Sequence, residues 1–293
     1  MSATNVVGWI GVGKMGAPMA GHLLKGGVDV TVFDARPENI AALEERGARA
    51  GESIEAVGRA CNVVFTSIPD DPALTSVASA LAPAMAKNAI LIDTSTVSPK
   101  ASAEAARLLA DHGIRYLRAP VSGSTTIAAA ANLTVLASGD ESAWVEVEPL
   151  IKLFSSERFY LGPADEARFM KLVLNTLVGA SASVLGEAIL LGEHGGLDRA
   201  QMMDVILKSA VSSPLLGYKR ETVVVDASEP AFRLDQMVKD FSLILAAAKD
   251  EHIDMDVSAL ILKQYQAAAE DGMEERDFFA LVDWIRDHAP RTG

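Results

Sequence analysis

The chain has 293 residues, of which 49% are hydrophobic and 22% charged, and its formal net charge at pH 7 is -13. This length favours about two domains with a large buried core, and the acidic balance argues against binding to nucleic acid or to an anionic membrane surface. The single cysteine, Cys61, excludes an intramolecular disulfide and a cysteine-based metal cluster.

The N-terminal segment "MSATNVVGWIGVGKMG" has no basic region followed by an apolar run and a small-residue cleavage site. We therefore expect no signal peptide and a cytoplasmic protein. Lys171 is the only charged residue between positions 169 and 186, and a lysine near the middle of a membrane span costs about 2.5–3.5 kcal/mol. The segment is accordingly predicted to be a buried helix of a soluble protein.

The first half of the chain alternates short apolar runs of β type with helix-type stretches that end in glycine. The predicted strands are 5–10, 29–34, 62–68, 89–95, 114–120 and 133–138, with a weaker one at 157–161. Strands that are almost wholly apolar and separated by helices indicate a parallel sheet covered on both faces. The fold class is therefore α/β, with a doubly wound, mostly parallel, Rossmann-like sheet.

The pattern changes near residue 163, after which almost every segment has helical character. The predicted helices are about 164–193, 198–209, 213–225, 234–251, 256–272 and 277–288. "TVVVD" (222–226) could be a short strand or a helix end, and "GGLD" (195–198) is typical of a helix C-cap followed by an Asp N-cap. We therefore predict one domain over residues 1–163 and an all-α domain over 164–293.

A glycine-rich loop follows the first predicted strand and precedes a helix. It consists of Gly11, Val12, Gly13, Lys14, Met15 and Gly16. In a dinucleotide site the first glycine permits the tight turn, the second lets the backbone approach a pyrophosphate, and the third allows close helix–strand packing. The pyrophosphate then lies at the positive end of the helix. This loop predicts that residues 1–163 bind a dinucleotide.

Asp34 ends the second predicted strand, 18 residues after Gly16, where an acidic side chain can accept hydrogen bonds from the adenosine ribose. A carboxylate there repels a 2′-phosphate, so NAD is favoured over NADP. Arg36 could partly offset this preference by pairing with the phosphate, so NADP stays an alternative.

Five motifs spread over most of the chain resemble those of the β-hydroxyacid dehydrogenase family, which includes 3-hydroxyisobutyrate dehydrogenase and tartronate semialdehyde reductase. They are "GVGKMGAPMA" (11–20), "DTSTVSP" (93–99), "APVSGS" (119–124), "KLVLN" (171–175) and "MVKD" (237–240). The resemblance implies hydride transfer between a nicotinamide cofactor and a small β-hydroxy acid or its semialdehyde. It also implies that the helical domain binds substrate and contacts other subunits, which makes a homodimer or homotetramer the expected assembly.

The same resemblance assigns roles to individual residues. Lys171 becomes the general acid/base, and Ser122, Gly123 and Asn175 bind the substrate. Ile68, Pro69 and Thr96 line the nicotinamide, and Lys239 reaches the cofactor, although Lys239 could instead form only a surface ion pair with Asp240.

The residues themselves favour the role of Lys171. Lys171 and Asn175 are four residues apart, so they share one face of an otherwise apolar helix. The five histidines are scattered, and no His–Asp or Ser–His arrangement offers another acid/base. A partly desolvated lysine has a pKa lowered toward neutrality, which suits proton transfer. No cluster with metal-ligand spacing is present, so we expect no metal.

Two departures from the family pattern flank the substrate stretch: Arg118 stands where the family usually has aspartate, and Ser124 replaces a glycine. They leave the identity of the small carboxylate substrate open. One alternative function is an imine reductase, although such enzymes commonly have Asp or Tyr in place of Lys171. The other is a protein that binds NAD without turnover.

Overall fold

The computed structural model describes residues 6–225 and 230–289. The chain divides into two compact units, Met1–Lys171 and Leu172–Gly293. This division falls inside one long helix rather than between elements, so the domain boundary expected at residue 163 stays a prediction. The first five residues of the N-terminal segment, and Asp226 at the end of "TVVVD", lie outside the described residues.

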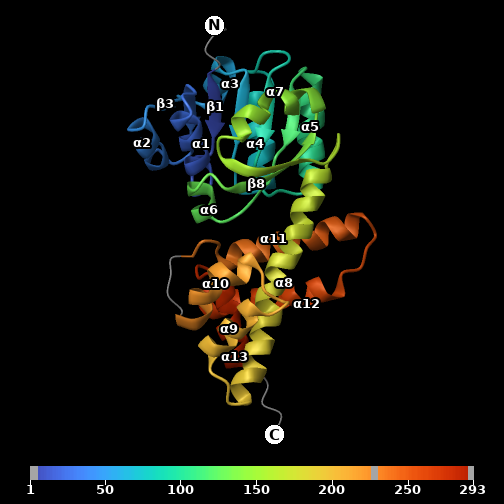
Figure 1. Ribbon diagram of the computed structural model, residues 1–293. Helices are drawn as coiled ribbons and strands as arrows, with labels where there is room; N and C mark the ends of the chain where they lie inside the picture. The colour runs from blue at the N-terminus through green and yellow to red at the C-terminus, as the bar shows by residue number, and fades with distance from the viewer. Residues whose placement is uncertain (1–5, 226–229, 290–293) are drawn as a thin grey trace. The chain divides into compact units, whose positions relative to one another are not determined.

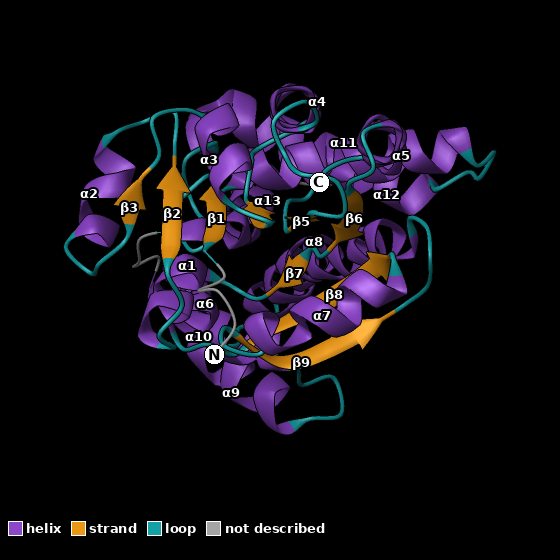
Figure 2. Ribbon diagram, turned by 90° about the horizontal axis from the view of Figure 1, so that it is seen from above, coloured by secondary structure: helices purple, strands orange, loops and turns teal. Residues whose placement is uncertain are grey.

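The first unit contains a nine-stranded sheet in the order β3-β2-β1-β4-β5-β6-β8-β7, with β9 paired to β8 (Figure 2). The strands are β1 Val7–Ile10, β2 Val30–Phe33, β3 Arg49–Ala50, β4 Val63–Thr66, β5 Ile90–Asp93, β6 Arg115–Arg118, β7 Val121–Ser122, β8 Leu133–Gly139 and β9 Ser155–Tyr160. Neighbouring strands from β3 to β6 are parallel, whereas β8 runs antiparallel to β6 and β7. The mostly parallel, doubly wound sheet is confirmed.

Both faces of the central strands are buried, as their unbroken apolar sequences predict. Trp9 of β1 and Phe65 of β4 belong to one hydrophobic cluster, and their rings stack with centroids 4.8 Å apart. Val64 and Leu91, on the opposite face, belong to a second cluster. This alternation is the period-two geometry of strands that are covered on both sides.

Helices connect the strands of the first unit. They are α1 Gly16–Lys25, α2 Glu38–Glu44, α3 Ile54–Ala60, α4 Asp71–Leu81, α5 Pro99–Asp111, α6 Thr125–Ala129 and α7 Glu141–Ile151. The side chains of Ser53, Asp70, Ser98 and Asp140 each accept a hydrogen bond from the backbone N–H three residues later. These N-caps satisfy donors that the first helical turn leaves open, and so fix where α3, α4, α5 and α7 begin.

The second unit is helical, as predicted, and follows the yellow-to-red part of the chain in Figure 1. Its elements are α8 Glu166–His194 (which begins in the first unit), α9 Arg199–Lys208, α10 Pro214–Val225, α11 Leu234–Asp250, α12 Asp256–Ala268, a π turn Ala269–Met273, a 3₁₀ turn Phe278–Ala280 and α13 Leu281–His288. Thr222–Val225 are helical, which resolves the alternative left open for "TVVVD". Gly196 has φ +85° and Asp198 caps α9, as "GGLD" predicts.

One face of α8 packs in the core of the second unit. A Cβ atom at Gly179 would lie 2.2 Å from the ring of Phe241, so only glycine allows α11 to approach this closely. The opposite face of α8 is exposed, so the expectation of a buried helix holds for one side only. Within residues 6–225 and 230–289, α8 alone is long and apolar enough to cross a membrane, a test that core helices of soluble proteins also pass.

Candidate active site

The glycine loop joins β1 to α1 with a backbone that requires glycine at both ends. Gly11 has φ +85°, and a Cβ there would lie 2.2 Å from the carbonyl oxygen of Ser67. A Cβ at Gly16 would lie 2.0 Å from the carbonyl oxygen of Gly11, whereas one at Gly13 would meet no atom within 4 Å. The backbone at Gly13 therefore faces open space at the start of α1, where a pyrophosphate can approach it.

Asp34 follows β2 and is bonded to the glycine loop. Its two carboxylate oxygens accept hydrogen bonds from the backbone N–H of Val12 at 2.8 Å and from the backbone N–H of Arg36 at 2.9 Å. In the loop, Lys14 is exposed and Met15 packs against the first hydrophobic cluster. The strand order reverses between β1 and β4, so the loop lies at the switch point where open α/β sheets bind ligands.

The residues expected to line the nicotinamide follow β4 and β5, which are adjacent and parallel. The backbone N–H of Ile68 donates to the Ser95 hydroxyl at 2.9 Å, which joins the loop after β4 to the loop after β5. Ile68 and Thr96 are half-buried and Pro69 is exposed. The structure thus places all three at the carboxyl edge of the sheet, together with the glycine loop.

The expected substrate stretch begins with the two-residue strand β7. Ser122 ends this strand and is half-buried. Gly123 has φ +141°, and a Cβ there would lie 2.7 Å from the Leu133 side chain, so glycine is required. Ser124, one of the two departures from the family pattern, accepts a hydrogen bond from the backbone N–H of Ile127 and caps α6. The side chain of Ser124 therefore has a structural role as the N-cap of α6.

Arg118, the other departure, is 6% exposed. Its Nε atom donates to Asp165 at 2.8 Å and to the Ser102 hydroxyl at 3.3 Å, and its guanidinium lies 4.9 Å from the ring centre of Tyr116. These contacts with residues of the first unit are enough to explain why an arginine is buried at this position, and no ligand is needed to account for it.

Lys171 and Asn175 lie one turn apart on α8, as predicted. Lys171 is half-buried and is the last residue of the first unit. Asn175, in the second unit, is 6% exposed and donates from its amide to Asp240 at 2.5 Å. Lys239 lies 3.4 Å from the other oxygen of Asp240. Asp240 therefore contacts two predicted site residues, Asn175 and Lys239. The ion pair between Lys239 and Asp240 that the sequence suggested is present, but Asp240 is only 1% exposed, so the pair is not wholly at the surface.

Sequence reasoning did not assign Asp240 to the site. The helical periodicity of α11 carries the missing signal, because Met237, Asp240, Phe241 and Ile244 lie on one buried face. A carboxylate on an apolar stripe must have partners, and Asn175 and Lys239 supply them.

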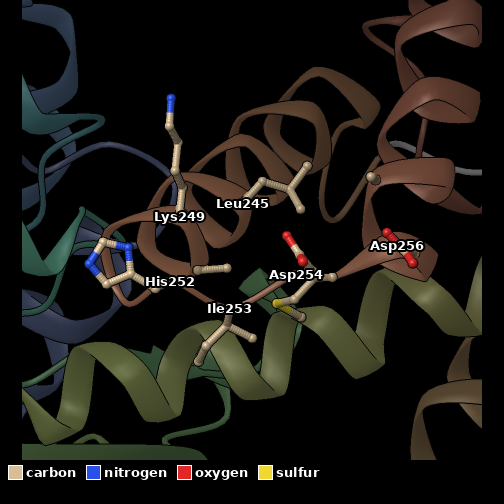
Figure 3. A pocket seen from close by; sticks show the side chains of 9 residues that line it. Leu245, Lys249, His252, Ile253, Asp254 and Asp256 are labelled. Carbon is tan, nitrogen blue, oxygen red and sulfur yellow. The ribbon is translucent and has the colours of Figure 1, made fainter.

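Within residues 6–225 and 230–289, no group of three or more His, Cys, Asp or Glu side chains could hold a metal ion. A hollow of about 430 Å³ lies beside the connection between α11 and α12 and is lined by Leu245, Ala248, Lys249, His252, Ile253, Asp254, Met255, Asp256 and Ala259 (Figure 3). None of the predicted site residues lines it, so it is not the candidate site.

Comparison with protein families gives two matches that together cover nearly the whole chain. Residues 6–162 match the NAD binding domain of 6-phosphogluconate dehydrogenase. Residues 166–285 match the NAD-binding family of NADP-dependent 3-hydroxyisobutyrate dehydrogenase.

Similar proteins agree with these matches. The 2-(hydroxymethyl)glutarate dehydrogenase of Eubacterium barkeri is 31% identical over 94% of this chain and 93% of its own length. Glyoxylate/succinic semialdehyde reductase 2 of Arabidopsis thaliana is 29% identical over 96% of this chain and 79% of its own. The solved structure of Mycobacterium tuberculosis 3-hydroxyisobutyrate dehydrogenase with L-serine superimposes with a TM-score of 0.89 at 25% identity, covering 97% of this chain and all of that one.

Solved imine reductases are also similar. One from a Pseudomonas species has a TM-score of 0.62 at 21% identity over 96% of this chain and 99% of its own. This likeness shows a shared fold only.

Proposed function

Because this chain belongs to the β-hydroxyacid dehydrogenase family and is an NAD(P)-dependent oxidoreductase acting on CH–OH groups, we propose that Lys171 carries out its proton transfer. The family and the activity predicted from the motifs are confirmed. The reaction moves a hydride between a nicotinamide and a small β-hydroxy acid or its semialdehyde.

In the proposed mechanism, Lys171 accepts the hydroxyl proton when the alcohol is oxidised and returns it when the carbonyl is reduced. The bound nicotinamide supplies the hydride acceptor or donor. Ser122 and the backbone N–H of Gly123 bind the substrate carboxylate, and Asn175 orients the hydroxyl or the carboxylate. The observation that carries this proposal is the half-buried lysine one turn from an asparagine that Asp240 holds in place.

The residues of the first unit fit a dinucleotide. The open backbone at Gly13 can hold the pyrophosphate, Asp34 the adenosine ribose, and Ile68, Pro69 and Thr96 the nicotinamide. Lys239 completes the proposed set of cofactor residues. The side chain of Asp34 lies beside the loop, which supports NAD as the preferred cofactor, with NADP as the alternative.

Asp34→Asn is expected to shift cofactor preference toward NADP. The amide keeps the size of the side chain but removes the negative charge that repels a 2′-phosphate, and like-charge contacts of this kind cost enough to change affinity by about tenfold or more. The ratio of kcat/KM for NADP to that for NAD measures the change. Asp111→Asn, at an exposed residue that ends α5, is the matched control. An unchanged ratio in Asp34→Asn would contradict the role of Asp34.

The substrate class and the rival activity can be tested in one panel. We expect the purified protein to reduce small semialdehydes, or to oxidise 3-hydroxy acids such as hydroxyisobutyrate, glycerate and serine, and to leave cyclic imines unreduced. Turnover of imines alone would favour the imine reductase alternative. Tight NAD binding without turnover of any compound would favour a non-catalytic protein.

A homo-oligomer that contacts through α8 is a further part of the proposal. Val173, Leu177, Val184 and Leu191 are 51–76% exposed, and their spacing places them along one face of the helix. An exposed apolar stripe of this length is typical of a protein interface. A second copy of the chain that presents the same stripe would bury it in a dimer or tetramer.

Leu177→Asp is expected to dissociate this oligomer, because it places a charge in the middle of the stripe. Light scattering after size-exclusion chromatography reports the mass. Val145→Asp, at a residue of α7 that is 69% exposed, is the control and should leave the mass unchanged. A variant of Leu177 that keeps the parental mass would argue against this interface.

We also propose that the protein is cytoplasmic and that its domain boundary lies at residue 163. Its partner is a small carboxylate substrate, and we expect it to bind neither nucleic acid nor membranes. The acidic net charge supports the absence of nucleic-acid partners. The need for a nicotinamide cofactor supports an intracellular compartment, which fractionation of cells can test.

A further inference from the structure

Arg168 lies in the first turn of α8, three residues before Lys171, and is 1% exposed. Its guanidinium pairs with the carboxylate of Asp93, which is fully buried at the end of β5. The same group donates to the carbonyl oxygen of Ser95 at 2.7 Å and to the Tyr116 hydroxyl at 3.0 Å. A single buried side chain thus joins the start of α8 to the strand and loop at β5.

The charges of this cluster are balanced. Burial works to lower the pKa of Arg168, but its interactions with Tyr116 and with the Asp93 carboxylate, including the hydrogen bonds to both, outweigh that effect and raise the pKa. Burial raises the pKa of Tyr116, so its hydroxyl stays neutral and accepts the guanidinium hydrogen bond. The Asp93 carboxylate also accepts hydrogen bonds from the hydroxyls of Thr66 and Ser95, each at 2.6 Å.

The cluster reaches both loops that we propose to line the nicotinamide. Ser95, whose carbonyl binds Arg168, directly precedes Thr96. The Ser95 hydroxyl accepts the hydrogen bond from the backbone N–H of Ile68. The first turn of α8, which precedes Lys171, is therefore connected to Thr96 and Ile68 through Arg168 and Ser95.

Arg118 provides a second attachment of the same turn. It pairs with Asp165, the residue before α8, and shares the Ser102 hydroxyl with Arg168, which donates to it at 3.2 Å. The departure from the family pattern at residue 118 therefore strengthens the hold on the start of α8.

Stability alone is a weak reason for this arrangement. Removing two charges from water has a large desolvation cost, and an apolar replacement of similar volume is often as stable. A fixed ion pair with several additional hydrogen bonds instead defines one geometry, and a misplacement of 1 Å in an active site can cost about 10²-fold in rate.

We propose that Arg168 is a positioning residue: by holding the first turn of α8 to Asp93 and Ser95, it fixes Lys171 relative to the loops that carry Ile68 and Thr96. This inference rests on the proposed proton transfer by Lys171. All of the residues involved belong to the first unit.

The test uses the full chain and two variants. In Arg168→Gln/Asp93→Asn both charges are removed together, so no buried charge is left unpaired. Arg168→Lys keeps the charge but cannot reach Asp93, Ser95 and Tyr116 at once, because an ammonium lacks the planar fork of a guanidinium. We expect the rate of hydride transfer at saturating cofactor, measured by stopped-flow absorbance of the nicotinamide, to fall by about tenfold or more in both.

Cofactor affinity separates positioning from a general loss of structure. The Kd for NADH, measured by fluorescence, should change much less than the rate, because the glycine loop and Asp34, which we propose to hold the pyrophosphate and the adenosine ribose, are not among the described hydrogen-bond partners of Arg168 or Asp93. Arg158→Gln/Glu148→Gln, which removes a half-exposed ion pair of the same unit, is the control and should keep the parental rate. A parental rate of hydride transfer in a folded Arg168→Lys variant would overturn the inference, as would a fall in rate that follows the loss of NADH binding.

Combination with Lys171→Ala separates this inference from the proposed function. If Lys171→Ala keeps full turnover, the proposed function fails. If it loses turnover while Arg168→Lys does not, only the positioning role fails. If Arg168 acts through Lys171, Arg168→Lys should have no further effect on the residual rate of Lys171→Ala, whereas additive effects would contradict that action.

Discussion

Lys171→Ala is expected to lower turnover by about 10²–10⁴-fold, the usual contribution of a positioned general acid or base. In the proposed mechanism the neutral amine of Lys171 accepts the hydroxyl proton during oxidation and the ammonium returns it during reduction, and an alanine side chain can do neither. The loss should appear in kcat at saturating substrate, because the interaction is made mainly in the transition state.

Cofactor binding should be retained in this variant, since we assign that role to the glycine loop and Asp34 and only the proton transfer to Lys171. Isothermal titration with NAD and steady-state kinetics with the best substrate of the panel measure the two properties separately. Lys208→Ala, at an exposed residue that ends α9, is the control and should have parental kinetics. A fully active Lys171→Ala protein would remove the lysine from the mechanism.

The elements of the fold were predictable where sequence pattern and burial coincide. Unbroken apolar runs between helices identify β1, β4 and β5, because these strands are buried on both faces. The strands β3 and β7 were missed, since a segment of two residues is too short to show a period. The last part of the helix predicted at 256–272 is a π turn in which Gly272 has φ +86°, a conformation that local helix propensity does not reveal.

The candidate site was predictable only in part. Spacing along the chain identifies the glycine loop, Asp34 and the two residues Lys171 and Asn175 of α8. Each of these positions can be recognised from its place relative to a nearby strand or helix. Asp93 and Arg168 were not found, because their contact joins residues 75 positions apart and a charge in sequence usually indicates a solvated face. From the sequence, the departure at Arg118 left the identity of the substrate open. In the structure the side chain of Arg118 contacts Asp165, Ser102 and Tyr116, which are residues of the protein itself.

A second buried ion pair, in the helical unit, gives a prediction about stability. Lys219 of α10 is 3% exposed, and its ammonium binds Asp277, which is 6% exposed. It also lies 5.0 Å from the ring centre of Phe278 and 5.7 Å from that of Phe279. Asp277 accepts a hydrogen bond from the backbone N–H of Phe279, so the pair fixes the 3₁₀ turn against α10.

Lys219→Met is expected to lower the free energy of unfolding by about 3–5 kcal/mol, because it leaves the Asp277 carboxylate buried without its counter-charge. Denaturant unfolding followed by circular dichroism measures the change. Lys219→Met/Asp277→Asn should recover most of the loss, since the uncharged amide can still accept the hydrogen bond from Phe279 and the methionine keeps the volume of the lysine stem. Arg220→Met, at the next residue of α10, removes an ion pair with the more exposed Asp204 and should cost less than about 1 kcal/mol. Equal losses in the single and double variants would mean that the contacts of Lys219 with the aromatic rings, rather than its charge balance with Asp277, stabilise this corner of the unit.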